Sequence, residues 1–202
     1  MFFAGLDLGQ RHDYSAVVVV ERIEHRRAFQ ATAFDKLLVR HVERMPLGTP
    51  YPKVVERMHE LLHSEELWGH CALAVDATGV GGPVVDMLRA ARLGCNVTAV
   101  TITGGERGME RSDRASVPKQ DLLAEIQVLL ETGRLKIGNV RDARVLMREL
   151  MDMRTSVNGS GRVRMGAEGT GQHDDLVIAL ALGCWGAMRK AGTCGERGQR
   201  LF

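Results

Sequence analysis

The sequence lacks the signatures of several protein classes. Its four cysteines show neither Cys-x-x-Cys spacing nor a histidine partner at zinc-finger spacing, so we expect reduced cysteines that pack in the interior. The amino terminus has no basic segment followed by a long apolar stretch, and no apolar run reaches the length needed to span a bilayer. These absences predict a soluble, cytoplasmic protein without a membrane partner.

Neither an internal repeat nor a long linker divides the chain of 202 residues. A hydrophobic fraction of 45% is sufficient for a core at this length, which predicts one compact domain over residues 1–190. Beyond it the composition turns to glycine and charged residues, so residues 191–202 are expected to form a flexible tail.

Positive and negative side chains are nearly balanced, with 27 Lys plus Arg against 25 Asp plus Glu, so the net charge implies no obligatory nucleic-acid partner. Their distribution is more informative, because basic residues gather in or beside predicted loops of the second half, where they can meet a phosphate backbone. For any single one of them, a solvated surface position is the simpler interpretation. These residues are Arg107, Arg111, Arg114, Lys119, Arg154, Arg162 and Arg164.

The first part of the chain predicts antiparallel strands. Apolar runs over residues 2–8 and 15–23 flank a turn-prone segment, which is typical of a β-hairpin. A mixed segment over residues 28–42 is expected to add a third antiparallel strand before the Pro- and Gly-containing break at residues 46–50.

The middle of the chain predicts alternating helices and strands. Apolar residues recur at helical spacing over residues 52–67, and an unbroken apolar run at residues 71–75 predicts a strand buried on both faces. A helix over residues 83–92 and a strand over residues 96–102 complete a βαβ unit. A ligand site is therefore expected beyond the carboxyl ends of its strands.

The last part of the chain is predicted to be mainly helical. Residues 104–117 are polar and favour a mobile loop, followed by helices over residues 118–132 and 141–152. An Asn-Gly pair predicts a hairpin over residues 155–164, which is either a surface excursion or a mobile ribbon near the site. An apolar helix over residues 176–188 follows.

Three aspartates lie in or directly beside apolar segments. Asp7 interrupts the first strand, Asp76 ends the buried strand and Asp175 precedes the last helix. A hairpin turn, an Asx-type turn and a favourable helix start would explain them one at a time. Buried carboxylates are costly without a positive partner, and Mg²⁺ and Mn²⁺ prefer hard oxygen ligands, so their joint occurrence favours a divalent-metal site.

The order of the predicted elements and acids resembles the ribonuclease-H-like fold. This resemblance implies an α/β domain whose mixed sheet has three antiparallel strands and then parallel strands, with helices on both faces. From residue 3 to about residue 188, five segments together resemble the nuclease domain of phage terminase large subunits. They are Gly5-Leu6-Asp7-Leu8-Gly9, Pro46-Leu47-Gly48-Thr49-Pro50-Tyr51-Pro52, Val75-Asp76-Ala77-Thr78-Gly79-Val80-Gly81, Val117-Pro118-Lys119 and His173-Asp174-Asp175-Leu176.

The resemblance implies a metal-dependent endonuclease that cuts double-stranded DNA during phage or prophage genome packaging in a bacterial host cell. Asp7 matches the first-strand acid expected to bridge two metal ions, Asp76 the acid after the fourth strand, and Asp175 the acid of the late motif. Two Mg²⁺ or Mn²⁺ ions about 4 Å apart can clamp the attacking and leaving oxygens of a phosphodiester.

Further residues near these acids have candidate roles. Asp174 matches an auxiliary acid, His173 is placed to position water, and Lys119 is placed to hold a phosphate, although ordinary surface positions beside helix starts explain the last two as well. DNA contacts are expected from Arg111 and Arg114 and from the ribbon residues Arg162 and Arg164.

The chain departs from complete terminase large subunits because it has no Gly-x-x-x-x-Gly-Lys-Ser or -Thr motif for an ATPase motor. We therefore expect a separate packaging ATPase, a small terminase subunit or a portal as partner. An excised domain, a split gene product and a prophage remnant all fit such a chain. The alternatives are a Holliday-junction-resolvase-like nuclease and a catalytically silent DNA-binding or assembly module. An actin-like ATPase fits less well because it needs a second lobe.

Overall fold

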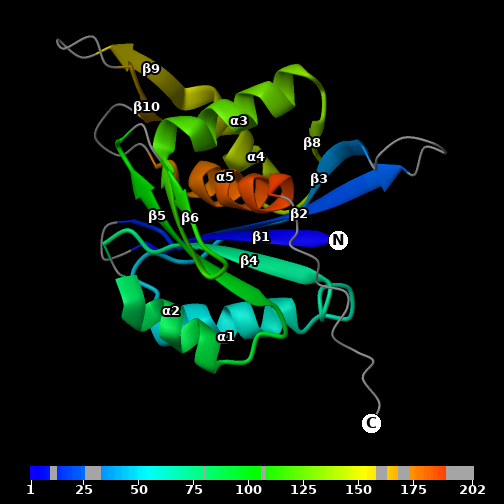
Figure 1. The fold of residues 1–202 in the computed structure, drawn as a ribbon, viewed down its shortest axis with the longest axis vertical. Helices are drawn as coiled ribbons and strands as arrows, with labels where there is room; N and C mark the ends of the chain where they lie inside the picture. Colours follow the sequence, from blue (N-terminus) through cyan, green and yellow to red (C-terminus); the bar gives the residue numbers. More distant parts are fainter. Residues whose placement is uncertain are drawn as a thin grey trace.

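A mixed β-sheet with helices on both faces forms the centre of the molecule. The computed structural model describes residues 1–9, 13–25, 33–79, 81–105, 108–157, 163–167 and 173–189. Eight strands are ordered β6-β7-β5-β4-β1-β2-β3-β8, and a separate pair, β9 and β10, forms a second small sheet. Helices α1 and α2 cover one face of the main sheet, and α3, α4 and α5 cover the other (Figure 1).

The strands of the main sheet are β1 (Phe2–Asp7), β2 (Ala16–His25), β3 (Ala33–Arg44), β4 (Cys71–Asp76), β5 (Asn96–Thr103), β6 (Met109–Glu110), β7 (Arg114–Pro118) and β8 (Leu135–Ile137). The second sheet consists of β9 (Met153–Val157) and β10 (Val163–Ala167). The helices are α1 (Tyr51–Leu62), α2 (Gly81–Ala90), α3 (Lys119–Glu131), α4 (Ala143–Asp152) and α5 (Asp175–Met188).

The three antiparallel strands predicted from the sequence are present. β1 pairs with β2 along its whole length, and β2 pairs with β3 with two irregularities in register. Valines 17 to 20 of β2 are all buried because the strand lies in the middle of the sheet and is covered on both faces.

The predicted βαβ unit is also present. β4 pairs in parallel with β1 on one side and with β5 on the other, and α2 forms the connection between β4 and β5. Because β1, β4 and β5 all run in the same direction, their carboxyl ends lie at one edge of the sheet.

The prediction of a mobile loop over residues 104–117 was wrong where this segment forms β6 and β7. β7 occupies its second half and pairs in parallel with β5, and β6 pairs antiparallel with β7. Among the described side chains of this segment, Ala115 and Val117 are the two that are buried, so the short strand shows little apolar character in sequence. The three-residue strand β8, which extends the sheet beside β3, was not predicted for the same reason.

The hairpin predicted around Asn-Gly corresponds to β9 and β10, which pair antiparallel. Residues 158–162 between these strands lie outside the described part of the chain, as do the predicted tail and most of the predicted first hairpin turn. The proposed boundary at residue 190 therefore stays a prediction.

The described cysteines agree with the expectation of reduced packing residues. Cys71 and Cys184 are buried, Cys95 is partly buried, and all three are free thiols. Among the described residues, none of the helices combines the length and the apolar character that a transmembrane span requires.

Helix α5 packs almost directly on the backbone of β1. It is buried over nearly its whole length, with Leu176, Leu180 and Leu182 fully inaccessible to solvent. The close approach depends on glycine, because a methyl group at Gly5 would lie 2.6 Å from the Gly183 backbone nitrogen and would also meet the Ala179 carbonyl oxygen. This contact fixes the distance between the first strand and the last helix.

Replacing Gly5 with alanine should therefore destabilise the protein. The added methyl group cannot be accommodated without moving β1 away from α5, which should cost about 1–3 kcal/mol or more and lower the melting temperature. Gly82→Ala is a suitable control because its methyl group meets no atom within 4 Å and replaces a glycine inside a helix. An unchanged melting temperature for Gly5→Ala, measured by circular dichroism, would contradict this packing.

Candidate metal centre

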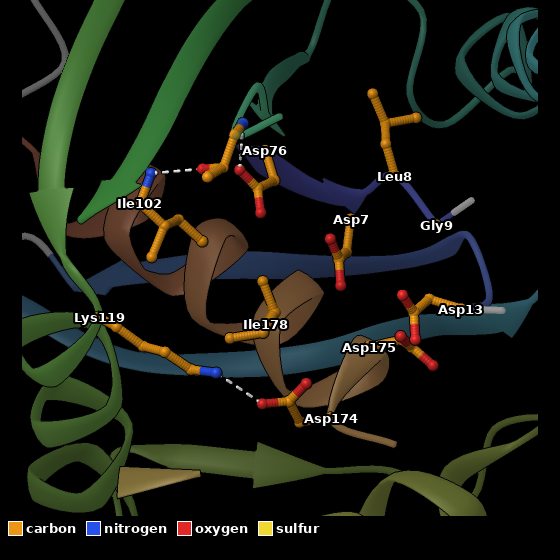
Figure 2. A pocket seen from close by; sticks show the side chains of 11 residues that line it. Asp7, Leu8, Gly9, Asp13, Asp76, Ile102, Lys119, Asp174, Asp175 and Ile178 are labelled. Carbon is orange, nitrogen blue, oxygen red and sulfur yellow. Dashed lines mark hydrogen bonds and ion pairs between the residues drawn. The ribbon is translucent and has the colours of Figure 1, made fainter. Parts of the chain in front are cut away.

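The carboxyl ends of two neighbouring parallel strands bring Asp7 and Asp76 to the same edge of the sheet. Each is the last residue of its strand, and the preceding residues Leu6 and Val75 are paired in register. Asp175 begins α5, whose first turn points toward this edge (Figure 2). The three predicted acids therefore meet, although they are far apart in the sequence.

These acids line one open cleft with a volume of about 290 Å³. Ile102 and Ile178 provide part of its apolar wall. Six charged side chains line the cleft, namely Asp7, Asp13, Asp76, Asp174, Asp175 and Lys119. Among the described residues of the lining, five carboxylates stand against one ammonium group, and this excess of negative charge attracts cations.

Burial and mutual repulsion disfavour ionisation of the predicted acids. Burial raises the pKa of Asp7 well above its ordinary value, and the negative charges of Asp76 and Asp175 raise it further. Burial also raises the pKa of Asp76. It raises the pKa of Asp175 to about 6, although the nearby Arg44 guanidinium acts in the opposite direction. A divalent cation would remove this repulsion.

Asp76 is held in place by a short chain of hydrogen bonds. The backbone N–H of Thr78 donates to Asp76 Oδ1 at 2.8 Å, and the Thr78 hydroxyl accepts a 2.8 Å hydrogen bond from the backbone N–H of Ile102. The Asx-type turn considered from the sequence is thus present. It involves one carboxylate oxygen of Asp76 and leaves the other available to the cleft (Figure 2).

Asp175 provides the clearest fit to a metal ligand. Its side chain is only 7% exposed, and its Oδ2 atom is buried without a hydrogen-bond partner. A buried carboxylate oxygen normally accepts hydrogen bonds, so this atom calls for a cationic ligand. The hard oxygen donors of Asp7, Asp76 and Asp175 are those that Mg²⁺ and Mn²⁺ prefer.

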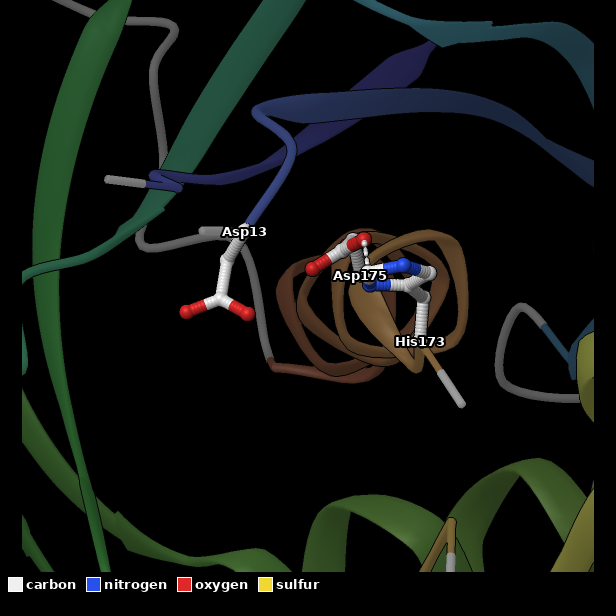
Figure 3. Close-up of side chains that lie close together, drawn as sticks. All are labelled: Asp13, His173 and Asp175. Atoms are coloured by element: carbon white, nitrogen blue, oxygen red, sulfur yellow. Dashed lines mark ion pairs between the residues drawn. The ribbon is translucent and has the colours of Figure 1, made fainter. Parts of the chain in front are cut away.

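The structure adds Asp13, which the sequence analysis treated only as part of a turn. Ligand atoms of Asp13, His173 and Asp175 lie within 4.8 Å of one another, and the His173 Nδ1 atom is 3.7 Å from Asp175 Oδ2 (Figure 3). An exposed aspartate in a polar turn gives no signal in a single sequence. Its position near the start of α5 is a property of the tertiary structure.

Lys119 and Asp174 contact each other across the cleft. Lys119 begins α3, and its Nζ atom lies 2.7 Å from Asp174 Oδ2 (Figure 2). Because the lysine is partly exposed and points into the cleft, it can exchange this partner for another anion, such as a phosphate.

Of the predicted DNA-contacting arginines, the two with described side chains, Arg111 and Arg114, do not line the cleft. Arg111 and Arg114 flank the turn between β6 and β7, where the Arg111 N–H donates to the Arg114 carbonyl oxygen at 2.7 Å. Arg114 begins β7 whereas Lys119 follows its end, a separation of roughly 16 Å along the strand. Arg162 lies outside the described residues, and only the backbone of Arg164 is described, in β10.

Solved structures of phage large terminases share this fold. The large terminase nuclease from thermophilic phage G20c with bound magnesium is 25% identical, with a TM-score of 0.64, over 92% of this chain and 80% of that chain. A mutant nuclease domain of the large terminase subunit gp2 of bacterial virus Sf6, with manganese and beta-thujaplicinol, is 12% identical, with a TM-score of 0.63, over 91% of this chain and 87% of that one. The HK97 bacteriophage large terminase is 16% identical, with a TM-score of 0.57, over 91% of this chain and 38% of that one.

No model of a protein family matches the chain, and no curated protein does either. The structural likeness nevertheless confirms the resemblance to phage large terminase nuclease domains. It also confirms the predicted fold class, a ribonuclease-H-like mixed sheet with helices on both faces.

The raised pKa values predict that the metal-free protein loses stability as the pH increases. The folded state binds protons at Asp7 and Asp175 more tightly than the unfolded chain does. This contribution is fully present below the ordinary aspartate pKa of 3.8 and is lost as the pH rises through the folded value, about 6 for Asp175. Thermal melting in EDTA should therefore show a lower melting temperature at about pH 7 than at about pH 5.

Asp7→Asn should reduce this loss, because it removes a buried charge that its neighbours repel. At about pH 7 in EDTA the variant should melt above the wild type, by about 2–4 °C for each kcal/mol of repulsion relieved. The exposed Asp86, on α2, provides the control variant Asp86→Asn. A lower melting temperature for Asp7→Asn than for the wild type would contradict the electrostatic interpretation.

Proposed function

We propose that this chain is a metal-dependent endonuclease of the terminase type, which hydrolyses double-stranded DNA in phage or prophage genome packaging. The observation that carries the proposal is the convergence of Asp7, Asp76 and Asp175 in one negative cleft at the carboxyl edge of the sheet. Their raised pKa values and the buried Asp175 Oδ2 atom, which accepts no hydrogen bond, are the features expected of carboxylates that bind a cation.

The similar proteins support this proposal. The G20c nuclease, at 25% identity, has structures with bound magnesium and with bound cobalt. We infer that the present chain holds two Mg²⁺ or Mn²⁺ ions, with Asp7, Asp76 and Asp175 as their principal ligands. The chemistry that such ions supply is activation of a water molecule and stabilisation of charge on the leaving oxygen of a phosphodiester.

The neighbouring side chains have supporting roles in the proposal. Asp13 and Asp174 extend the set of carboxylates around the ions, and His173 is close enough to Asp175 to orient it or a water molecule. Lys119 would leave Asp174 and hold a phosphate of the bound DNA. No side chain acts as a covalent nucleophile in this scheme.

The partners belong to the same proposal. The sequence contains no phosphate-binding loop of an ATPase, and the HK97 large terminase is much longer than this chain, which covers 38% of it. We infer that translocation of DNA requires a packaging ATPase, with a small terminase subunit or a portal as further candidates. Action takes place in the cytoplasm of a bacterial host cell.

Cleavage of supercoiled plasmid tests the proposal most directly. Purified protein should nick or linearise the plasmid with Mg²⁺ or Mn²⁺ and should be inactive with a chelator. Asp7→Asn and Asp175→Ala should each lower the rate at least about 100-fold, because removing a metal ligand costs more than removing one of its supporting groups. Asp86→Asn should retain the wild-type rate.

The alternatives predict different results in the same assay. Preferential cleavage of four-way junctions over plain duplex would favour a resolvase-like nuclease. A folded protein that binds DNA but cuts none with either ion would favour a silent module, and activity retained by Asp175→Ala would identify a contaminating nuclease.

The predicted basic ribbon can be tested separately. Replacing both Arg162 and Arg164 with alanine should weaken DNA binding and reduce the slope of log affinity against log salt concentration by about 1–2, because up to two phosphate contacts are lost. Fluorescence anisotropy with a labelled duplex measures this slope. The control variant Arg92→Ala/Lys136→Ala removes two exposed basic residues near the opposite end of the sheet. Equal slopes for the ribbon variant and the wild type would indicate that the ribbon does not contact DNA and is a surface excursion.

A further inference from the structure

The first turn of α5 is capped by a side chain from a different helix. Asp174 occupies the N-cap position, but it makes no capping hydrogen bond because its carboxylate pairs with Lys119. Instead, the backbone N–H of Leu176 donates to Glu149 Oε2 at 3.0 Å. Glu149 lies on α4 and is buried. Both Asp174 and Asp175 are thereby released from capping and face the cleft.

Arg44 connects this cap to the proposed metal ligand. It is the last residue of β3, and its guanidinium forms an ion pair with Glu149. The same Nη2 atom lies 3.8 Å from Asp175 Oδ2. The guanidinium also lies over the ring of Tyr14, with its central carbon 4.8 Å from the ring centroid, and Tyr14 in turn packs edge-on against His173 at 4.9 Å.

The charges of Arg44, Glu149 and Asp175 depend energetically on one another. A carboxylate as deeply buried as that of Glu149 would be costly without the arginine. An arginine without Glu149 would place its full positive charge beside Asp175, where it would oppose the binding of a cation. Glu149 therefore offsets the positive charge of Arg44 at short range, so that this charge opposes cation binding in the cleft less strongly.

We propose that Arg44 and Glu149 form a positioning pair for the metal centre, in which Glu149 both fixes the start of α5 and holds the Arg44 charge back from Asp175. The inference rests on the proposed function. It assigns to two residues outside the recognised sequence segments a measurable effect on metal affinity, in addition to their contribution to stability.

Charge-neutral variants separate this role from a merely structural one. Glu149→Gln keeps an oxygen that can accept the Leu176 hydrogen bond but releases Arg44 toward Asp175, so Mn²⁺ should bind about 10- to 100-fold more weakly. Arg44→Gln removes the competing charge, so Mn²⁺ should bind as tightly as in the wild type or more tightly, although the apo protein should melt lower. The double variant should return to near wild-type affinity.

Isothermal titration with Mn²⁺, beside thermal melting in EDTA, measures both effects without relying on cleavage. The matched control is Glu43→Gln, because Glu43 forms an ion pair with Arg57 of α1, with nitrogen–oxygen distances of 2.9 and 3.0 Å, and neither residue lines the acidic cleft. This control should lower the melting temperature and leave Mn²⁺ affinity unchanged.

The possible results distinguish the inference from the function on which it rests. A wild-type protein that neither binds Mn²⁺ nor cuts DNA overturns both. If the wild type binds Mn²⁺ and cuts DNA, a Glu149→Gln variant that binds Mn²⁺ with wild-type affinity overturns the inference alone. Equal loss of Mn²⁺ affinity in Glu149→Gln, Arg44→Gln and the double variant has the same consequence. Should Glu149→Gln fail to fold, Arg44→Gln decides the matter, and clearly weaker Mn²⁺ binding by that variant contradicts the proposed charge balance.

Discussion

Electrostatic repulsion among buried carboxylates is the constraint on which the arrangement of the site depends. Asp7, Asp76 and Asp175 are held at one edge of the sheet, where burial and like charges raise their pKa values. A fold tolerates such a cluster only if rigid neighbouring elements hold it together. The apolar strands β1 and β4 and the buried helix α5 provide that rigidity, so the core holds in place the charges that repel one another.

The surrounding polar groups each restrict one of these acids without neutralising the cleft. Thr78 occupies one oxygen of Asp76, Lys119 pairs with Asp174, and Arg44 approaches Asp175 while its main partner is Glu149. Lys119 and Arg44, two positively charged residues described near the cleft, are therefore each paired with a carboxylate. This distribution leaves the centre negative, which is favourable for divalent cations and unfavourable for DNA unless cations are bound.

The sequence alone was sufficient for most of the fold, because β1, β2, β4 and α5 contain unbroken apolar runs. It failed at β7 and β8, which are short and take their stability from pairing with β5 and β3 rather than from their own residues. The helix start at Asp175 was predicted, but its cap by Glu149 was not, since the two residues are separated by 26 positions in the chain.

The identity of the candidate acids was determined by sequence, because a carboxylate inside an apolar strand is unusual enough to be recognised locally, as for Asp7 and Asp76. Their convergence, and the addition of Asp13, Arg44 and Glu149, was decided only by the tertiary structure. The physical reason is that proximity between separate elements depends on strand order, on strand direction and on the close packing of α5 against Gly5, none of which is encoded in the local pattern around any one of these residues.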